Sequence, residues 1–301
     1  MFSIITPTYN RAHTLARVYN SLISQTYKNF EWIIIDDASN DGTEELVRIW
    51  INQNLFKITY HVLNENKGKP FALNFGFEYC QFPITIIADS DDEFTSDTLS
   101  DLKILWDSVN NTEHALKIAT IWTLVIDENN TLVGESFPYN FWQVDLKNRI
   151  LNRENEIKGE KWHSWRTDIL KTYKMYHNDS SFISESATWN NINKKYDFLC
   201  VNIFHRKYFH SPDGLILKEK TRIEIEKKKY YNSYYQLKDT SIKDILRYKY
   251  YWNYAFDYIH SRLNYKDQDL KLDIQKHSVS IILTLIFLPI KIISFLRYKL
   301  S

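Results

Sequence analysis

The chain has 301 residues, of which 25% are charged and 16% aromatic, with only 6 glycines, 6 prolines and 2 cysteines. This composition excludes collagen-like, low-complexity and disulfide-stapled chains, and the length allows one large or two small domains with a sizeable core. The formal net charge of +1 hides an uneven distribution, because acids outnumber bases about two to one in residues 1–130 and bases predominate afterwards.

An acidic N-terminal half suits a metal site, whereas a basic C-terminal half suits anionic phosphates or lipid head groups. The sequence carries no nucleic-acid-binding motif, so nucleic acid is not an expected partner. Residues 2–6 are too short an apolar run for a signal peptide, and we expect the first strand of a domain there instead. Cys80 and Cys200 lack metal-ligand spacing and fit a reducing cytosol.

Strand-like and helix-like stretches alternate through the first 126 residues. The strand-like runs are 2–6, 31–35, 58–62, 84–88 and 118–126, and apolar residues recur at helical spacing in 15–23, 43–50 and 70–79. This βαβαβαβ order predicts an α/β fold, with a mixed, mostly parallel sheet and helices on both of its faces.

Loop-forming polar residues follow each predicted parallel strand. They are Pro7 to Asn10, Asp36, Asp37, Asn66, Lys67 and the segment from Asp89 to Asp92. Because ligands of open α/β sheets bind outside the carboxyl ends of the strands, we expect these side chains to surround one crevice.

The fourth predicted strand ends in four acids within residues 89–93, in the segment ITIIADSDDEF. Buried, unpaired carboxylates are costly and repel one another, so a cation is expected beside them. Mg²⁺ or Mn²⁺ fits, because such ions bind through one or two carboxylates together with substrate phosphates. The alternative is a solvated acidic turn in which Ser96 or Asp97 caps the next helix.

Four segments in this order closely resemble the nucleotide-binding half of the family-two glycosyltransferases with the GT-A fold. They are FSIITPTYNR, IIIDDASNDGT, ENKGKPFALNFG and IIADSDDEF. The resemblance extends over residues 2–126 and thins afterwards. It implies a GT-A-like sheet and a metal-dependent enzyme that uses a nucleotide-sugar donor, with UDP as the expected nucleotide.

By this resemblance, Asp89-Ser90-Asp91 is similar to the DxD motif of the family. Asp91 would then be a metal ligand, and Asp89 would contact the metal or the donor ribose. Asp36 matches the acid that reads the donor base, where a carboxylate can accept the uracil imide N–H. The alternative for Asp36 and Asp37 is an Asx-type turn with no ligand.

The same resemblance implies donor contacts elsewhere at the crevice. Pro7, Thr8 and Tyr9 match the turn beside the donor base, and the Tyr9 ring could pack on the base. Asn66 and Lys67 match further donor-binding positions. For Tyr9, the alternative is a ring that only fills a corner of the core.

Beyond residue 126 the pattern changes, and we assign residues 127–214 to the acceptor-side half of a catalytic domain whose nucleotide-binding half is residues 1–126. The stretch 127–161 is polar with few periodic apolar positions, and an aromatic and basic patch at 160–170 then leads into a short helix. In this patch Trp162 and Trp165 would stack on a sugar or anchor the core, and His163 is expected to be structural.

Residues 182–190, FISESATWN, resemble the segment in which these transferases carry one acid or a Glu-Asp pair at the start of a helix. Glu185 is therefore the candidate catalytic base, with Ser186 standing where many relatives have a second acid. The alternative is a glutamate that only favours a helix N-terminus, in which case Asp179 is the reserve base.

A strand-like run at 198–204 precedes a basic stretch. Arg206 or Lys207 would contact donor phosphates, and His210 would contact the metal or the diphosphate. The alternative is that these side chains flank an edge strand and only keep the protein soluble.

Residues 215–301 form a Lys- and Tyr-rich, mainly helical extension. The run 279–288 is almost wholly apolar, Pro289 interrupts it, and an apolar run resumes around Lys291. The proline and the charge favour a kinked, monotopic amphipathic anchor over a full membrane span. We therefore expect a peripheral or monotopic protein at the cytoplasmic face of the cell membrane.

The residues and the resemblance together predict an inverting glycosyltransferase that moves a sugar from a UDP-sugar to a hydroxyl of a bacterial surface glycan, such as lipopolysaccharide or capsule. The expected acceptor is a glycan or a lipid-linked glycan. One alternative is a sugar-phosphate nucleotidyltransferase, although residues 6–11 lack a glycine for a phosphate loop. The other is a membrane-bound glycan-binding protein derived from a transferase whose base was lost at Ser186.

Overall fold

The computed structural model describes residues 1–301 except for 154–156, 179–182, 210–220 and 265–301. Four parallel strands open the sheet in the spatial order β3-β2-β1-β4. Their bounds are Phe2–Thr8 (β1), Phe30–Asp36 (β2), Lys57–Val62 (β3) and Ile84–Ile87 (β4). The prediction of a mostly parallel sheet is confirmed, and the carboxyl ends of these strands lie along one edge.

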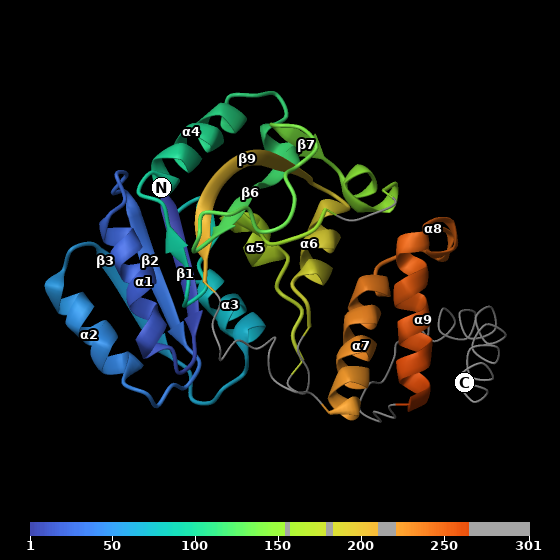
Figure 1. The fold of residues 1–301 in the computed structure, drawn as a ribbon, viewed down its shortest axis with the longest axis horizontal. Coiled ribbons are helices and arrows are strands. Elements are labelled where there is room, and N and C mark those ends of the chain that lie inside the picture. Colours follow the sequence, from blue (N-terminus) through green and yellow to red (C-terminus); the bar gives the residue numbers. More distant parts are fainter. Residues whose placement is uncertain (154–156, 179–182, 210–220, 265–301) are drawn as a thin grey trace.

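The second half of the chain continues the same sheet, in the order β4-β8-β6-β9-β5 with β7 also on β9. The strands are Glu93–Phe94 (β5), Ile118–Asp127 (β6), Trp142–Val144 (β7), Lys161–Arg166 (β8) and Asp197–Tyr208 (β9). Strand β8 is antiparallel to both β4 and β6. The two predicted halves of the catalytic domain therefore share one continuous sheet, along which β9 curves in Figure 1.

Helices cover both faces of the sheet because successive strand residues point to opposite sides. Phe2 and Ile4 belong to one core cluster and Ile5 to the other. The first cluster includes side chains of α1, α2 and α4, and the second includes those of α3, α5 and α6. Figure 1 labels these helices around the sheet. Their bounds are Ala12–Ile23 (α1), Thr43–Gln53 (α2), Lys69–Phe77 (α3), Thr98–Asn110 (α4), Thr167–Thr172 (α5) and Ser186–Asn193 (α6).

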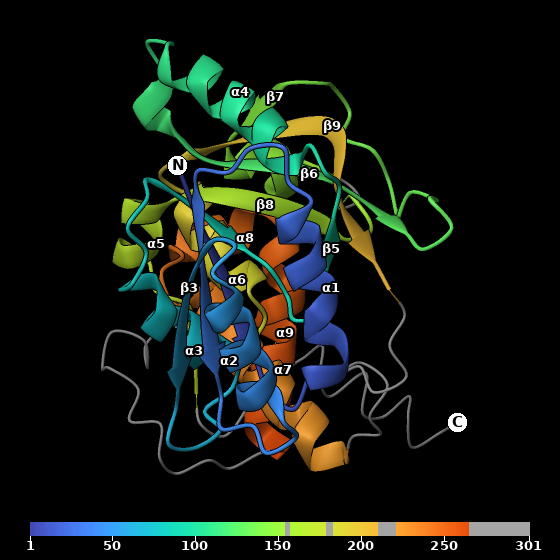
Figure 2. The same ribbon diagram turned by 90° about the vertical axis from the view of Figure 1, so that its left-hand side faces the viewer.

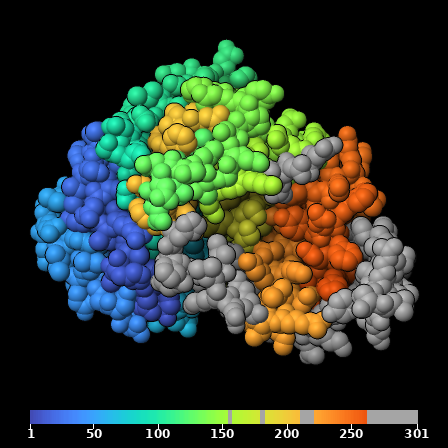
Figure 3. Space-filling view, in the orientation of Figure 1, coloured from blue at the N-terminus to red at the C-terminus, as the bar shows by residue number. Residues whose placement is uncertain are grey.

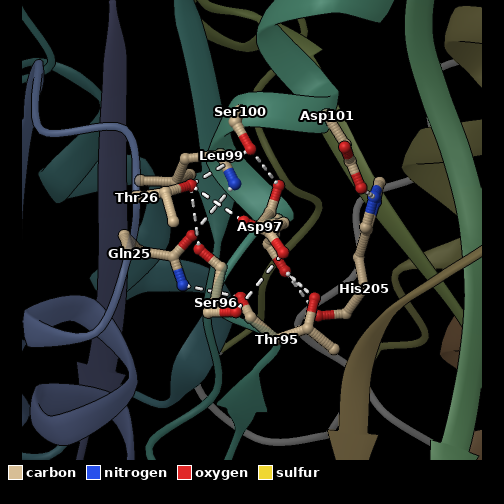
Figure 4. Close-up of polar contacts among 10 residues, drawn as sticks. Gln25, Thr26, Thr95, Ser96, Asp97, Leu99, Ser100, Asp101 and His205 are labelled. Carbon is tan, nitrogen blue, oxygen red and sulfur yellow. Dashed lines mark hydrogen bonds and ion pairs between the residues drawn. The ribbon is translucent and has the colours of Figure 1, made fainter.

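The start of α4 is held by a side chain from a distant part of the chain (Figure 4). Asp97 occupies the N-cap position, but its side chain makes no capping hydrogen bond. Instead, Gln25, which lies two residues after the end of α1, accepts a hydrogen bond from Leu99 N at 3.0 Å and donates one to Thr95 O at 2.8 Å. Asp97 therefore has the cap position that the alternative interpretation gave it, but the side-chain oxygen that accepts a hydrogen bond in the first turn of α4 belongs to Gln25.

In the described part of the C-terminal extension the predicted helices are present, and α7 (Arg222–Leu237), α8 (Ile242–Arg247) and α9 (Lys249–Asn264) contribute to a third core cluster. Buried tyrosines, among them Tyr230, Tyr231 and Tyr258, dominate it. Figures 1 and 2 place α7 and α9 on the side away from α2, and Figure 3 shows a hollow between these orange helices and the green middle of the chain.

Within the described residues, no helix is both long and apolar enough to span a bilayer. The predicted membrane anchor at 279–296 lies outside the described residues, as do the reserve base Asp179 and the candidate phosphate ligand His210.

Among the described residues between β6 and β8, the elements are short: β7 and a π-helical turn at Lys147–Leu151. The short helix that we predicted after the aromatic and basic patch is α5. The patch itself, at residues 161–166, forms strand β8, which we did not predict and whose middle four residues are all buried. The sequence KWHSWR shows no period of two because both faces of this strand are covered by core side chains.

Candidate active site

The turns after β1 and β2 are joined by hydrogen bonds, so they form one unit at the edge of the sheet. Asn10 N donates to Ser39 Oγ, and Asn40 N donates to Asn10 Oδ1, each at 2.8 Å. Asn10 and Ala38 both have left-handed backbone conformations, with φ of 52° and 66°. Such strain in non-glycine residues commonly marks functional loops.

The predicted donor-base turn lies at this unit. Pro7 and Thr8 are buried at the end of β1, whereas Tyr9 is 45% exposed, so its ring does not fill a corner of the core. The buried Thr8 hydroxyl has no hydrogen-bond partner among the described residues. A buried polar group without a partner is costly, and a bound ligand could satisfy it.

Asp36 is buried at the end of β2 with both carboxylate oxygens engaged. Ser39 N donates to Oδ1 at 2.7 Å, and the Tyr60 hydroxyl donates to Oδ2 at 2.5 Å. Burial, followed by the neighbouring Asp36, raises the pKa of Tyr60, which keeps that hydroxyl protonated. Each Asp36 oxygen retains further acceptor capacity, so an N–H of a donor base could still bind. Our sequence analysis missed Tyr60.

Asp37 anchors the loop that precedes α3. It accepts hydrogen bonds from Lys67 N at 2.8 Å and Gly68 N at 2.7 Å. The loop therefore reaches the same sheet edge as predicted, and Asn66 and Lys67 are exposed on it. The Lys67 ammonium pairs with Glu65 at 3.1 Å, so its side chain is directed along the loop.

Two of the acids after β4, Asp89 and Asp92, have cationic partners, which offset the cost of burying their carboxylates. Lys69 Nζ lies 2.6 Å from Asp89 Oδ1, and Arg206 lies 3.8 Å from the other oxygen of Asp89. Arg206 also pairs with the buried Asp92, which in turn accepts a hydrogen bond from Asp89 N. Burial raises the pKa of Asp89, but Lys69 and Arg206 lower it by more.

Arg206 is thus buried in an ion-pair network, and the alternative in which it only keeps an edge strand soluble is wrong. Breaking a buried pair leaves an uncompensated charge. We expect Arg206→Leu to lower the free energy of unfolding by about 3–5 kcal/mol. The matched variant on the same strand, Lys207→Leu, should change it by no more than about 0.5 kcal/mol. Urea denaturation of both variants measures this, and equal losses would contradict the role of the network.

Glu185, at the start of α6, forms an ion pair with Lys69, the lysine that also pairs with Asp89. Lys69 Nζ lies 2.8 Å from Glu185 Oε1, so one ammonium on α3 joins the candidate base to the candidate donor acid. Partial burial lowers the pKa of Lys69, but Asp89 and Glu185 raise it by more, so the amine stays protonated. Our sequence analysis singled out Lys67 and missed Lys69, two residues further on.

The aromatic patch that we considered as a sugar platform belongs to the core. Trp162 and Trp165 are 3% and 0% exposed, and the Trp165 ring stacks on Trp189 with centroids 4.3 Å apart. His163 accepts a hydrogen bond from Trp165 Nε1 at 2.7 Å. Burial lowers the pKa of His163 to about 4, so its ring is neutral at physiological pH. The interpretation of these two tryptophans as sugar-stacking platforms is wrong.

The carboxylates at this edge could hold a divalent ion only if oxygen atoms of a bound substrate supplied the remaining ligands. Within the described ranges, no three His, Cys, Asp or Glu side chains are grouped to hold a metal. Asp89 and Asp92 are compensated by Lys69 and Arg206, whereas Asp91 is half-buried and forms no ion pair with any described residue. Asp91 with Asp89 offers the one or two carboxylates that Mg²⁺ or Mn²⁺ uses alongside substrate phosphates.

The continuous mixed sheet, with its acids at the carboxyl end of β4, has the architecture of a GT-A glycosyltransferase. Residues 3–115 match the family model described as glycosyl transferase family 2, so this part of the chain is similar to that family.

Curated relatives match part of the chain. The putative teichuronic acid biosynthesis glycosyltransferase TuaG of Bacillus subtilis is 32% identical over 101 residues, which is 33% of this chain and 39% of TuaG. The poly(ribitol-phosphate) beta-N-acetylglucosaminyltransferase TarS of Staphylococcus aureus is 25% identical over 199 residues, which is 62% of this chain and 34% of TarS. The chain therefore spans well under half the length of these relatives.

Solved structures show the same fold over nearly the whole chain. S. aureus TarS 1–349 in complex with UDP has a TM-score of 0.57 at 18% identity, covering 92% of this chain and 76% of that one. A mannosyltransferase from Pyrobaculum calidifontis in complex with GDP-Man and Mn²⁺ has a TM-score of 0.55 at 15% identity, covering 94% and 80%. At such identities these likenesses show the fold alone.

Proposed function

We propose that the chain is an inverting glycosyltransferase that moves a sugar from a UDP-sugar to a hydroxyl of a bacterial surface glycan. The observation that carries this proposal is the pair of contacts made by Lys69. Its ammonium touches Asp89 at 2.6 Å and Glu185 at 2.8 Å, so the two carboxylate oxygens are no farther apart than the sum of these distances. A candidate donor acid and a candidate base thus face one small space.

The donor side of the proposal is supported by the polar edge formed by β1, β2 and β4. Asp36 and the unpartnered Thr8 hydroxyl offer buried polar atoms where a base and ribose would bind. UDP is supported as the nucleotide because TarS structures of the same fold are described in complex with UDP and with UDP-GlcNAc.

The acceptor side is supported by the names of the relatives. They include a teichuronic acid biosynthesis enzyme, a poly(ribitol-phosphate) transferase and the abequosyltransferase RfbV of Salmonella typhimurium. A hydroxyl of a surface glycan such as lipopolysaccharide or capsule, free or lipid-linked, is the acceptor that these names favour. We further propose that the C-terminal segment holds the enzyme at the cytoplasmic face of the membrane.

Two charges set the barrier to this reaction: the departing diphosphate and the proton of the attacking hydroxyl. Mn²⁺ or Mg²⁺ held by Asp91 and Asp89 would supply Lewis-acid neutralisation of the leaving oxygens. Glu185 accepts the hydroxyl proton as general base. Lys69 orients Glu185 toward the donor side, because its ammonium binds both acids at once. A single displacement with the base opposite the leaving group inverts the anomeric carbon.

Release of UDP measures the proposed activity directly. The full chain is incubated with a panel of UDP-sugars and Mn²⁺, with and without a surface-glycan acceptor. Acceptor-stimulated UDP release supports a transferase. A nucleotidyltransferase would instead release inorganic pyrophosphate from a nucleoside triphosphate and a sugar phosphate, and a glycan-binding protein would bind acceptor without turnover. Either of those two results would contradict the proposed transferase activity.

Lys69 provides a sharper test of the shared site. Lys69→Met should lower kcat about tenfold, because Glu185 loses the contact that orients it and like charges then face each other. Lys69→Arg should recover part of this loss. Lys103→Met, which removes a half-buried lysine from a helical ion pair with Asp107 on α4, is the control and should leave kcat unchanged. Equal kcat values for Lys69→Met and the control would show that the bridge has no part in turnover.

A further inference from the structure

Two aromatic rings on neighbouring strands carry hydrogen-bond donors for which the described residues offer no acceptor. Trp122 of β6 and His163 of β8 lie opposite each other in the sheet, and their ring centroids are 5.4 Å apart. The indole Nε1 of Trp122 is buried and forms no hydrogen bond with any residue that the structure describes. We call these two rings the Trp122–His163 pair. Because a buried donor without an acceptor is costly, a bound group that accepts hydrogen bonds is expected here.

The hydrogen bond from Trp165 determines which nitrogen of His163 carries a hydrogen atom. An indole N–H can only donate, so His163 Nδ1, which lies 2.7 Å from Trp165 Nε1, is the acceptor. In a neutral imidazole the other nitrogen, Nε2, then bears the hydrogen. Burial lowers the pKa of His163 to about 4, so the ring is neutral at physiological pH. His163 Nε2 is therefore a second donor, and it has no hydrogen-bond partner within the described ranges.

Strand register places the pair at the edge of the sheet that carries the acids. Ser164 pairs with Ile86 of β4 in the antiparallel ladder. His163, one residue before Ser164, is therefore level with Ile87, the last residue of β4. Asp89 follows two residues later in the chain. The pair thus lies at the carboxyl end of β4, beside the candidate donor acid.

The His163 ring is on the face of the sheet covered by α6, the helix that begins beside Glu185. The centroid of this ring is 5.1 Å from that of Trp189 on α6. Trp189 N donates a hydrogen bond to Glu185 O at 3.1 Å, so these two residues are one helical turn apart. Residues four apart lie on the same side of a helix. His163 therefore packs on the side of α6 that also carries Glu185.

The free nitrogen of His163 is directed toward the same edge. The two nitrogens of an imidazole point in nearly opposite directions, and Nδ1 points to Trp165, which pairs with Thr85 farther from the end of β4. Nε2 is thus directed toward the carboxyl end of that strand. After burial, the charges of Glu185 and Lys69 have the largest influence on the pKa of His163, which agrees with a position near the Lys69 bridge.

The chemistry of the pair favours an oxygen that accepts hydrogen bonds without donating one. Both free nitrogens are donors. A sugar hydroxyl brings an O–H that needs an acceptor of its own, whereas a carbonyl oxygen has two lone pairs and no hydrogen. A carboxylate also accepts only, but its charge is costly to bury against neutral rings. The nearby cations Lys69 and Arg206 are already paired with acids. A neutral carbonyl is therefore the best match.

We infer that the Trp122–His163 pair binds the carbonyl oxygen of an acylamino group on the transferred sugar. The inference rests on the proposed transfer from a UDP-sugar and adds the class of sugar, an N-acylamino sugar in place of a plain hexose. The pair takes no part in proton transfer, because neither ring has a free lone pair when His163 is neutral. It determines which donor sugar binds beside Glu185.

Matched donor nucleotides test the pair without turnover. The full chain is titrated by calorimetry in the presence of Mn²⁺ with UDP-GlcNAc against UDP-Glc, and with UDP-GalNAc against UDP-Gal. Within each couple the two sugars differ only in having an acetamido group or a hydroxyl at one carbon. We expect the acetamido sugar of at least one couple to bind about fivefold more tightly, the size of one net hydrogen bond between neutral groups.

Trp122→Phe should remove most of this preference, a change of about fivefold, because it deletes the indole N–H and keeps an aromatic ring. The deleted N–H has no partner among the described residues, so the fold should be retained. The matched control is Trp50→Phe, on α2 in the other core cluster, which should leave the preference unchanged. His163→Phe also deprives Trp165 of its acceptor, so this variant is judged by the ratio of the two dissociation constants.

Nuclear magnetic resonance provides a readout that a purely structural role would not change. The indole N–H signal of Trp122 is assigned from its absence in Trp122→Phe. We expect this signal to move downfield when the preferred acetamido donor binds, and to stay in place with its hydroxyl counterpart and with UDP alone.

Each outcome decides the inference. Equal binding within both couples, or the same preference in Trp122→Phe and Trp50→Phe, overturns it, and acceptor-stimulated UDP release would then leave the proposed transfer standing. A preference that depends on Trp122, without transfer to any acceptor, supports the pair while the proposed transfer fails.

Discussion

Glu185→Gln should lower kcat by at least about a hundredfold while leaving the Kd for UDP unchanged, because general-base catalysis typically contributes a factor of that size or more. The amide is nearly isosteric with the carboxylate but cannot take the acceptor proton. It can still accept a hydrogen bond from Lys69, whose ammonium lies 2.8 Å from the present carboxylate oxygen. Steady-state UDP release with acceptor gives kcat, and calorimetry gives the Kd.

The control for this variant is Glu78→Gln, which neutralises an exposed glutamate paired with Lys174 away from the sheet edge. It should leave both constants unchanged. Near-normal turnover of Glu185→Gln would remove Glu185 as the base. Asp179, which lies outside the described residues, would then be the acid to replace next.

Asp91→Asn should abolish metal-dependent transfer, with a loss on the order of a thousandfold, because metal neutralisation of a leaving group supplies several kcal/mol. The fold should be retained, since Asp91 is half-buried and forms no ion pair within the described part of the chain. Titrating Mn²⁺ into the UDP-release assay measures the effect, and thermal unfolding checks stability. Asp107→Asn, on the surface of α4, is the control for loss of one carboxylate. An unchanged response to Mn²⁺ in Asp91→Asn would contradict the assignment of the metal.

Much of the sheet edge was predictable because its residues follow parallel strands directly. Asp36 is the last residue of β2, and Asp89 follows β4 closely. Parallel strands bring their carboxyl ends to one edge of the sheet regardless of the conformation of the connecting loops. Local sequence also indicated the α6 start at Glu185. These features depend on strand direction and helix spacing, which short stretches of sequence encode.

The contacts between distant segments were not predictable in the same way. Lys69 bridges Asp89 and Glu185, Tyr60 donates to Asp36, and Gln25 caps α4. Each depends on how separate elements pack, and no local pattern distinguishes such a side chain from an exposed one. Strand β8 was missed for a related reason: it is buried on both faces, so the alternation that marks a half-buried strand is absent.

The central claim is that the acids after β4 hold a cation which binds the pyrophosphate of a nucleotide. Calorimetry of the full chain with Mn²⁺ and UDP together tests it most directly. We predict saturable UDP binding that requires Mn²⁺ and is lost in Asp91→Asn. An absence of any association between the folded wild-type protein and UDP in the presence of Mn²⁺ would contradict it.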